Sequence, residues 1–285
     1  KDGGLRWDFY RPKEAPCGDK MTAIFDLNQY AIGGAVILTL ILSTVALQIW
    51  IKRCLGNETI KSFHEVGGYY MSVAGTLYAV ILGMVVVDSL SHFNEARQHL
   101  EIEAHSLGEV YVMAGKMPSQ VRANIRETIR EYTEETLKKG WQHMQNGEPD
   151  HEGLALFERV ILEAEEVEPL SENQKTLYAA MVNSVISAGE SRRERVINSH
   201  NQIPDVEWFS LIVGGIMTIA FTMFFATDHS LGQSIMTAMV TLFVSLNLYL
   251  AFLFSSPYSG DLQVPKDGFI ALKHFIDTKH RSETK

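Results

Sequence analysis

The densest group of potential metal ligands in the sequence is a row of histidines and glutamates between residues 92 and 105. Its members are separated by three or four residues, so a helix would place them on one face. Imidazole and carboxylate groups bind divalent ions, but a good site needs three or four converging ligands, and one helix rarely supplies them. We therefore interpret the row as a polar helix face and expect no metal. The row comprises His92, Glu95, His99 and Glu103, with Glu101 and His105 as a neighbouring pair.

The sequence contains neither a catalytic motif nor a disulfide framework. It has no HExxH, Walker A, GxSxG or CxxC pattern, so no group of residues offers a nucleophile with its base. The two cysteines, Cys17 and Cys54, lie on opposite sides of the first apolar block, and they cannot pair if that block crosses a membrane. We predict a protein that is not an enzyme and uses no cofactor.

The distribution of apolar residues favours a membrane protein. Hydrophobic residues make up 46% of the 285 residues, and they are concentrated in four blocks, at 30–51, 69–87, 208–227 and 234–254. Each block is close to the roughly 20 residues that a helix needs to cross a bilayer. The net charge of −9 argues against a nucleic-acid partner. We therefore expect the lipid bilayer to be the main partner of this protein.

The second apolar block continues into charged sequence without a break signal. Tyr69 to Val87 contains nineteen consecutive residues without a charge, and neither Pro nor Gly follows before Gly108. This pattern predicts one helix that leaves the membrane at Asp88 and projects into water.

Small residues recur along one side of this predicted helix. Their spacing of three and four residues lets another backbone approach closely in lipid, and Gly214 with Gly215 permits the same in the third block. Two interpretations stay open: the stripe packs within one subunit, or copies of it surround a shared axis and line a pore. In the second case Asp88 would add a ring of negative charge at one mouth and favour cations. The stripe comprises Gly68, Ser72, Gly75, Ala79 and Gly83.

The charged interval between the second and third blocks has helical periodicity and no useful strand alternation. Helices are expected at 119–143 and 154–167, and Ser171 with Gln174 has capping-box spacing for a helix running toward His200. We predict an all-α fold of four transmembrane helices, with a helical soluble domain inserted between helices two and three. The predicted parts are an N-terminal arm at 1–28, transmembrane helices one and two within 29–87, the soluble domain at 88–207, transmembrane helices three and four within 208–254, and a C-terminal tail at 255–285.

Polar side chains within the first apolar block need little explanation. Thr39, Ser43 and Thr44 can bond to carbonyls of their own helix, and Gln48 can reach the membrane interface. In the tail, 269–276 is typical of a short amphipathic helix, and we expect the last nine residues to be disordered.

The fourth block carries a polar edge. Thr237, Thr241 and Ser245 recur every four residues, and the nearby amide of Asn247 is expected to bond across to another helix. Packing between helices and a polar conduit both stay open for this edge.

Four crossings would place the arm, the charged interval and the tail on one side of the membrane. The basic residues that flank the crossings favour a cytoplasmic location for this side, because cytoplasmic flanks are enriched in Lys and Arg. Those favouring it are Arg97, Arg192, Arg193, Arg195, Lys20 and Lys266, against Lys52, Arg53 and Lys61 for the reverse.

Several stretches, taken in order and spacing, resemble the bestrophin-like family of bacterial membrane proteins. They are HEVGG at 64–68, GTLYAVILGMVVV at 75–87, FNEA at 93–96 with EA at 103–104, AFTMFF at 220–225, and PYSGDLQV at 257–264 with AL at 271–272. The resemblance covers about residues 30–275. It implies four transmembrane helices with a helical domain between the second and third, in a bacterial inner (cytoplasmic) membrane.

The resemblance also implies a function, because the family is distantly related to bestrophins, which are pentameric anion channels. It would turn Gly75, Ala79, Gly83 and Val87 toward a pore axis. The leading hypothesis is an oligomeric ion channel, and the alternative is a non-conducting scaffold or accessory subunit of a larger membrane complex. The candidate pore-lining residues are Ser72, Gly75, Ala79, Gly83, Val87 and Asp88.

Overall fold

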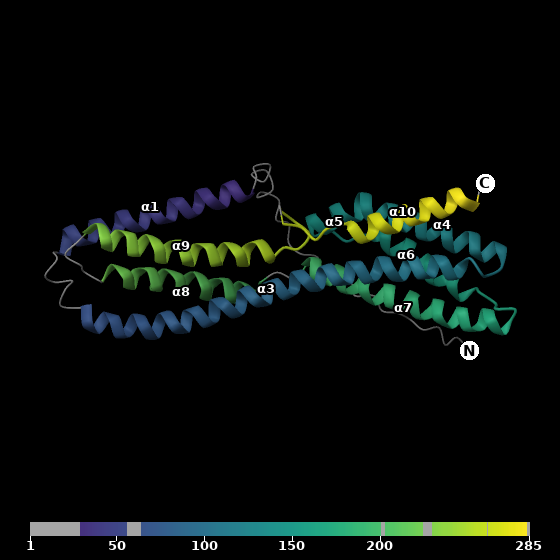
Figure 1. Cartoon of the computed structure of the whole chain (residues 1–285), viewed down its shortest axis with the longest axis horizontal. Coiled ribbons are helices and arrows are strands. Elements are labelled where there is room, and N and C mark those ends of the chain that lie inside the picture. Colours follow the sequence, from purple (N-terminus) through teal and green to yellow (C-terminus); the bar gives the residue numbers. More distant parts are fainter. Residues whose placement is uncertain (1–28, 56–63, 201–202, 225–229, 261, 284–285) are drawn as a thin grey trace.

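The computed structural model describes residues 29–55, 64–200, 203–224, 230–260 and 262–283, and every regular element within these ranges is helical (Figure 1). The helices form two groups along one long axis, joined by the longest helix, α3. The apolar bundle consists of α1 (Gln29–Leu55), the first half of α3 (His64–Ala114), α8 (Asp205–Met223) and α9 (Ser230–Phe254). The polar bundle consists of the second half of α3 with α4 (Ser119–Glu135), the π-helical turn η2 (Thr136–Gly140), α5 (Trp141–Asn146), α6 (His151–Glu165), α7 (Glu172–His200) and α10 (Asp267–Glu283).

The helix α3 runs through both bundles without interruption. It contains 51 residues, which at about 1.5 Å per residue gives a rod of roughly 77 Å. The predicted continuation of this helix past Asp88 is therefore confirmed. A bilayer core is only about 30 Å thick, so more than half of the rod extends beyond the length that a membrane requires.

The apolar bundle contains four helices that are long and apolar enough to cross a membrane. In this bundle α3 packs against α8 and α9, and α1 lies beside α9. Buried side chains from three helices form its small core, including Tyr78 and Leu82 of α3, Leu211 of α8 and Val244 of α9.

The predicted close approach at Gly214 and Gly215 is confirmed. A methyl group on Gly214 would overlap the ring of Tyr78, and one on Gly215 would lie 2.9 Å from the Tyr78 hydroxyl oxygen. Glycine is therefore what allows the Tyr78 ring to lie against the backbone of α8.

The polar bundle has the larger core. It is built from fully buried aromatic and aliphatic side chains, among them Tyr132, Trp141, Phe157 and Phe269. The last of these belongs to α10, which packs against α3 and α4. The tail therefore completes this core, and the expected disorder of its last nine residues is wrong at least as far as Glu283, where α10 ends.

Local capping sets two helix starts in the polar bundle. Asp150 accepts a hydrogen bond from the Gly153 amide at 2.8 Å, so α6 begins one turn earlier than predicted. The predicted capping box is formed in part: Ser171 accepts from the Gln174 amide at 3.2 Å, whereas Gln174 accepts from the amide of Leu170, the residue before the cap, at 2.8 Å.

Candidate functional site

The small-residue stripe lies on an open side of α3. Ser72, Ala79 and Gly83 are exposed and Gly75 is half-buried. A methyl group built on Gly83 would meet no atom within 4 Å, and one on Gly75 would meet only the Met71 side chain of the same helix, at 3.9 Å. Among the described residues, nothing from another helix packs closely on the stripe at these two glycines.

A different side of α3 makes the contacts within the subunit. Tyr78, Leu82, Val85 and Ser89 are buried and recur at three- and four-residue spacing, which is the pattern of a helix face. The contacts of this chain therefore do not support the interpretation that the stripe packs within one subunit. The small-residue stripe is therefore available for contacts with molecules outside this subunit.

Asp88 does not share the face of the stripe. Five residues separate it from Gly83, and at about 100° per residue it lies roughly 140° away around the helix. Its carboxylate is 3.4 Å from the imidazole of His92. Val87 is exposed and lies at the edge of the stripe, about 40° from Gly83. The structure thus brings five of the six predicted residues to one side and separates the sixth.

The same open face continues along the polar half of α3. Leu90, Asn94, Arg97 and Glu101 are all exposed and follow Gly83 at intervals of seven, four, three and four residues. Arg97 donates a hydrogen bond to Glu101 at 2.9 Å. One exposed helix face therefore runs from the small residues of the apolar bundle to charged residues in the polar bundle.

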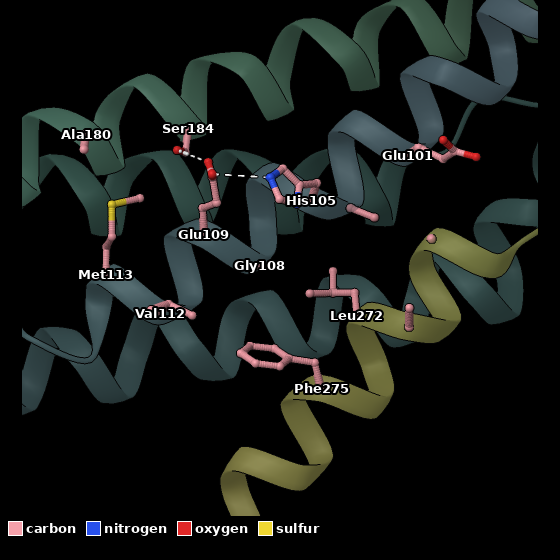
Figure 2. A pocket seen from close by; sticks show the side chains of 13 residues that line it. Glu101, His105, Gly108, Glu109, Val112, Met113, Ala180, Ser184, Leu272 and Phe275 are labelled. Carbon is pink, nitrogen blue, oxygen red and sulfur yellow. Dashed lines mark hydrogen bonds and ion pairs between the residues drawn. The ribbon is translucent and has the colours of Figure 1, made fainter.

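This face ends in a groove of about 690 Å³ between α7 and α10 (Figure 2). Leu272 and Phe275 of α10 line one side, and the floor comes from α3. At the opposite side Glu109 accepts a hydrogen bond from Ser184 of α7 at 2.7 Å, and its other oxygen is 3.4 Å from His105 (Figure 2). Sequence reasoning missed this groove, because it depends on how α7 and α10 flank α3.

A buried ion pair lies in the core of the polar bundle. Arg195 of α7 donates to both carboxylate oxygens of Glu103, at 2.6 and 3.0 Å, and to the Tyr132 hydroxyl at 3.2 Å. Tyr132 in turn donates to Glu103. Burial alone would lower the pKa of Arg195, but the Glu103 carboxylate raises it, and burial raises the pKa of Tyr132. The guanidinium and the phenol therefore keep their protons.

The histidines and glutamates of the row at 92–105 lie in different environments. Glu103 is inside the core and fully paired, whereas His92 is exposed and contacts Asp88 and Glu95. No cluster of three or more potential metal ligands occurs among the described residues. Burial also affects the orientation argument, because Arg195 and Arg192 are 1% and 6% exposed and are not surface charges facing a membrane.

The polar edge of α9 faces α1. The hydroxyl groups of Thr241 and Thr44 lie 3.2 Å apart, and Gln48 is buried beside α9 at 3% exposure, so the expectation that Gln48 reaches the interface is wrong. Asn247 is half-buried and donates to the Phe243 carbonyl of its own helix at 2.9 Å. The predicted bond of the Asn247 amide to another helix is therefore not formed within the described part of the chain.

Comparisons with known proteins agree with this architecture. A family model described as the Bestrophin-like domain matches residues 38–269. No curated protein matches the chain significantly. A crystal structure of a bacterial bestrophin homologue from Klebsiella pneumoniae is similar over 84% of this chain and 97% of that one, with 15% identity and a TM-score of 0.63. A point variant of a bestrophin homologue from the same organism is similar over 85% and 96%, with 14% identity and a TM-score of 0.65.

Proposed function

The chain belongs to the bestrophin-like family, and from this membership we propose that it is an oligomeric membrane channel for small anions. Copies of α3 surround a common axis, with Ser72, Gly75, Ala79, Gly83 and Val87 toward the conduit. The observation that carries the proposal is the open face of α3: its small residues have no packing role within the subunit, although such residues serve close helix contacts in lipid.

The position of Asp88 on α3 removes one argument for cations. Asp88 lies away from the small-residue face, so it does not place a negative ring on the conduit. From Gly83 toward the polar bundle, the first charged residue on that face is Arg97, whose guanidinium is paired with Glu101. Positively charged rings favour anions in pores, and we assign Arg97 this role where the conduit leaves the membrane.

The polar bundle forms a water-exposed domain on the cytoplasmic side, built mainly from the interval between the second and third crossings and completed by α10 after the fourth. Without the buried Arg192 and Arg195, this orientation rests on Arg97, Arg193, Lys20 and Lys266. The expected location is a bacterial inner membrane. A cysteine introduced at exposed Glu172, at the start of α7, in a variant whose Cys17 and Cys54 are replaced by serine, tests the orientation: impermeant thiol reagents should label it in inverted vesicles and not in intact cells.

A tryptophan scan of α3 tests the pore. The full-length protein is reconstituted into liposomes, and chloride efflux is compared for wild type, Ala79→Trp and Leu77→Trp. Leu77 is 62% exposed and lies roughly 160° from Ala79 around the helix, so its bulk should face lipid. Ala79→Trp should abolish efflux and Leu77→Trp should preserve it. Equal efflux from wild type and Ala79→Trp would rule out an axis lined by this face.

The groove between α7 and α10 favours a second candidate function. Its mostly apolar lining would suit a partner subunit, as expected of a non-conducting scaffold or accessory subunit. Purification in mild detergent separates the two candidates. A symmetric oligomer of this chain that conducts in liposomes supports the channel, whereas single copies that co-purify with unrelated subunits and do not conduct support the scaffold.

A further inference from the structure

The contact between α1 and α9 is a ladder of polar pairs inside the apolar bundle. Thr44 faces Thr241 at 3.2 Å between hydroxyl oxygens, and Lys52 donates to Gln233 at 3.4 Å. The two helices are antiparallel neighbours (Figure 1). A step of eight residues forward along α1, from 44 to 52, is matched by a step of eight back along α9, from 241 to 233.

The register therefore places Gln48 opposite Thr237, midway between the two pairs. Both side chains are buried, at 3% and 1% exposure. The carbonyl oxygen of Gln48 and the hydroxyl oxygen of Thr237 are buried without a hydrogen-bond partner among the described residues. These two oxygens have no partner in the part of the chain that the structure describes and lie between two hydrogen-bonded pairs of the same two helices. This arrangement indicates that one further molecule bonds to both oxygens.

We propose that a water molecule occupies this level and bridges α1 to α9. It donates one hydrogen to the Gln48 carbonyl oxygen and bonds through the Thr237 hydroxyl, which can donate or accept. Buried waters typically satisfy such groups with two to four hydrogen bonds. A cation is disfavoured because the ladder contains no carboxylate and the Lys52 ammonium lies one turn away. An anion is disfavoured because the unpartnered atom of Gln48 is a carbonyl oxygen.

The water bridge contributes to the attachment of α1 to the rest of the subunit. Only 11% of the apolar window of α1 is buried, and in lipid its apolar side chains gain little by leaving lipid for protein. The polar ladder, completed by the water, then fixes α1 on the subunit together with the close packing of Gly33 against the Tyr249 ring. The site lies within one subunit, so it is independent of whether α3 lines a pore.

A double-mutant cycle tests the bridge, using thermal unfolding of the full-length protein in nanodiscs. Thr237→Val and Gln48→Met each remove one partner and leave the other group unsatisfied, so each should lower Tm, by about 2–4 °C. The double variant removes both polar groups and should recover most of the loss, since replacing both partners by apolar groups of similar shape is nearly neutral. The control is Thr39→Val, whose hydroxyl is exposed and bonds within its own helix.

The opposite outcomes overturn the proposal. If the two oxygens have no partner, each single substitution should raise Tm, because it removes a buried unsatisfied group. Single losses that simply add in the double variant would also exclude a shared water. A map of the wild type at about 2 Å resolution gives a test that depends on no variant: density between Gln48 and Thr237 is expected, and its absence excludes the bridge.

Discussion

Arg195 of α7 and Glu103 of α3 form a bidentate ion pair that is 1% and 0% exposed. It joins the long helix that spans both bundles to the helix that returns toward the membrane. The pair also contacts Tyr132 of α4, so one buried charge pair fixes the relative position of three helices.

Removing one member of this pair should strongly destabilise the polar bundle. Arg195→Met leaves the Glu103 carboxylate buried without its counter-charge, which typically costs about 3–5 kcal/mol. Thermal unfolding of the purified protein should show this as a large fall in Tm. Combining Arg195→Met with Glu103→Leu should restore part of the loss, and a change below about 1 kcal/mol in the single variant would contradict the burial of the pair.

Glycine 214 should not tolerate a methyl group. Gly214→Ala would overlap the Tyr78 ring, and overpacking of this kind costs about 1–3 kcal/mol. Gly83→Ala is the matched control, since a methyl group there meets no atom within 4 Å of the same subunit. Unfolding in detergent should show a lower Tm for Gly214→Ala only. Equal losses in both variants would mean that helix propensity or an intersubunit contact dominates.

The start of α6 should depend on Asp150. Asp150→Ala removes the acceptor of the Gly153 amide and should cost about 1 kcal/mol, as is usual for an N-cap. Asp150→Asn keeps an acceptor and should cost less. Amide hydrogen exchange in the first turn of α6 reports the effect locally, and unchanged protection in Asp150→Ala would disprove the cap.

Two neighbouring glutamates should respond to pH with opposite signs. Burial raises the pKa of Glu135, with a further contribution from Glu152. Its stabilising contribution is therefore fully present below the unfolded pKa and is lost as the pH rises through the folded pKa. Glu135→Gln should then raise Tm at pH 7.5, and its advantage over wild type should shrink as the pH falls toward about 4.3.

Glu134 provides the control for this prediction. The hydrogen bond from Lys138 lowers the pKa of Glu134, so its contribution is present above the unfolded pKa and lost as the pH falls through the folded pKa. Glu134→Gln should lower Tm slightly at pH 7.5, and this loss should vanish in acid. Tm differences from wild type that are independent of pH in both variants would contradict the assigned environments.

The periodicity of the chain was enough to predict most of the helices, but not the π-helical turn at Thr136–Gly140 within the predicted helix at 119–143. An uninterrupted apolar block followed by charged sequence without Pro or Gly predicts a continuous α3, because local hydrogen bonds and the absence of a break signal are sufficient to define a helix. The capping pair Ser171 and Gln174 was predictable for the same reason, since capping acts over three residues.

Tertiary structure decided which helix faces meet. Gln48 could as well have reached the interface, and Arg195 could have been a surface charge. Each outcome depends on the position of a helix distant in sequence: α9 for Gln48, and α3 with α4 for Arg195. The groove beside Phe275 likewise exists only because the tail helix packs on α3.

The sequence by itself therefore determined that the chain is helical, where most of the helices lie and which four segments are apolar, because these follow from interactions between residues a few positions apart. Only the tertiary structure decided which side of α3 is buried, where the charges of the polar bundle pair, and which polar groups meet between α1 and α9. These depend on packing across long sequence separations, where several arrangements satisfy the same local pattern and the close fit of facing side chains selects one.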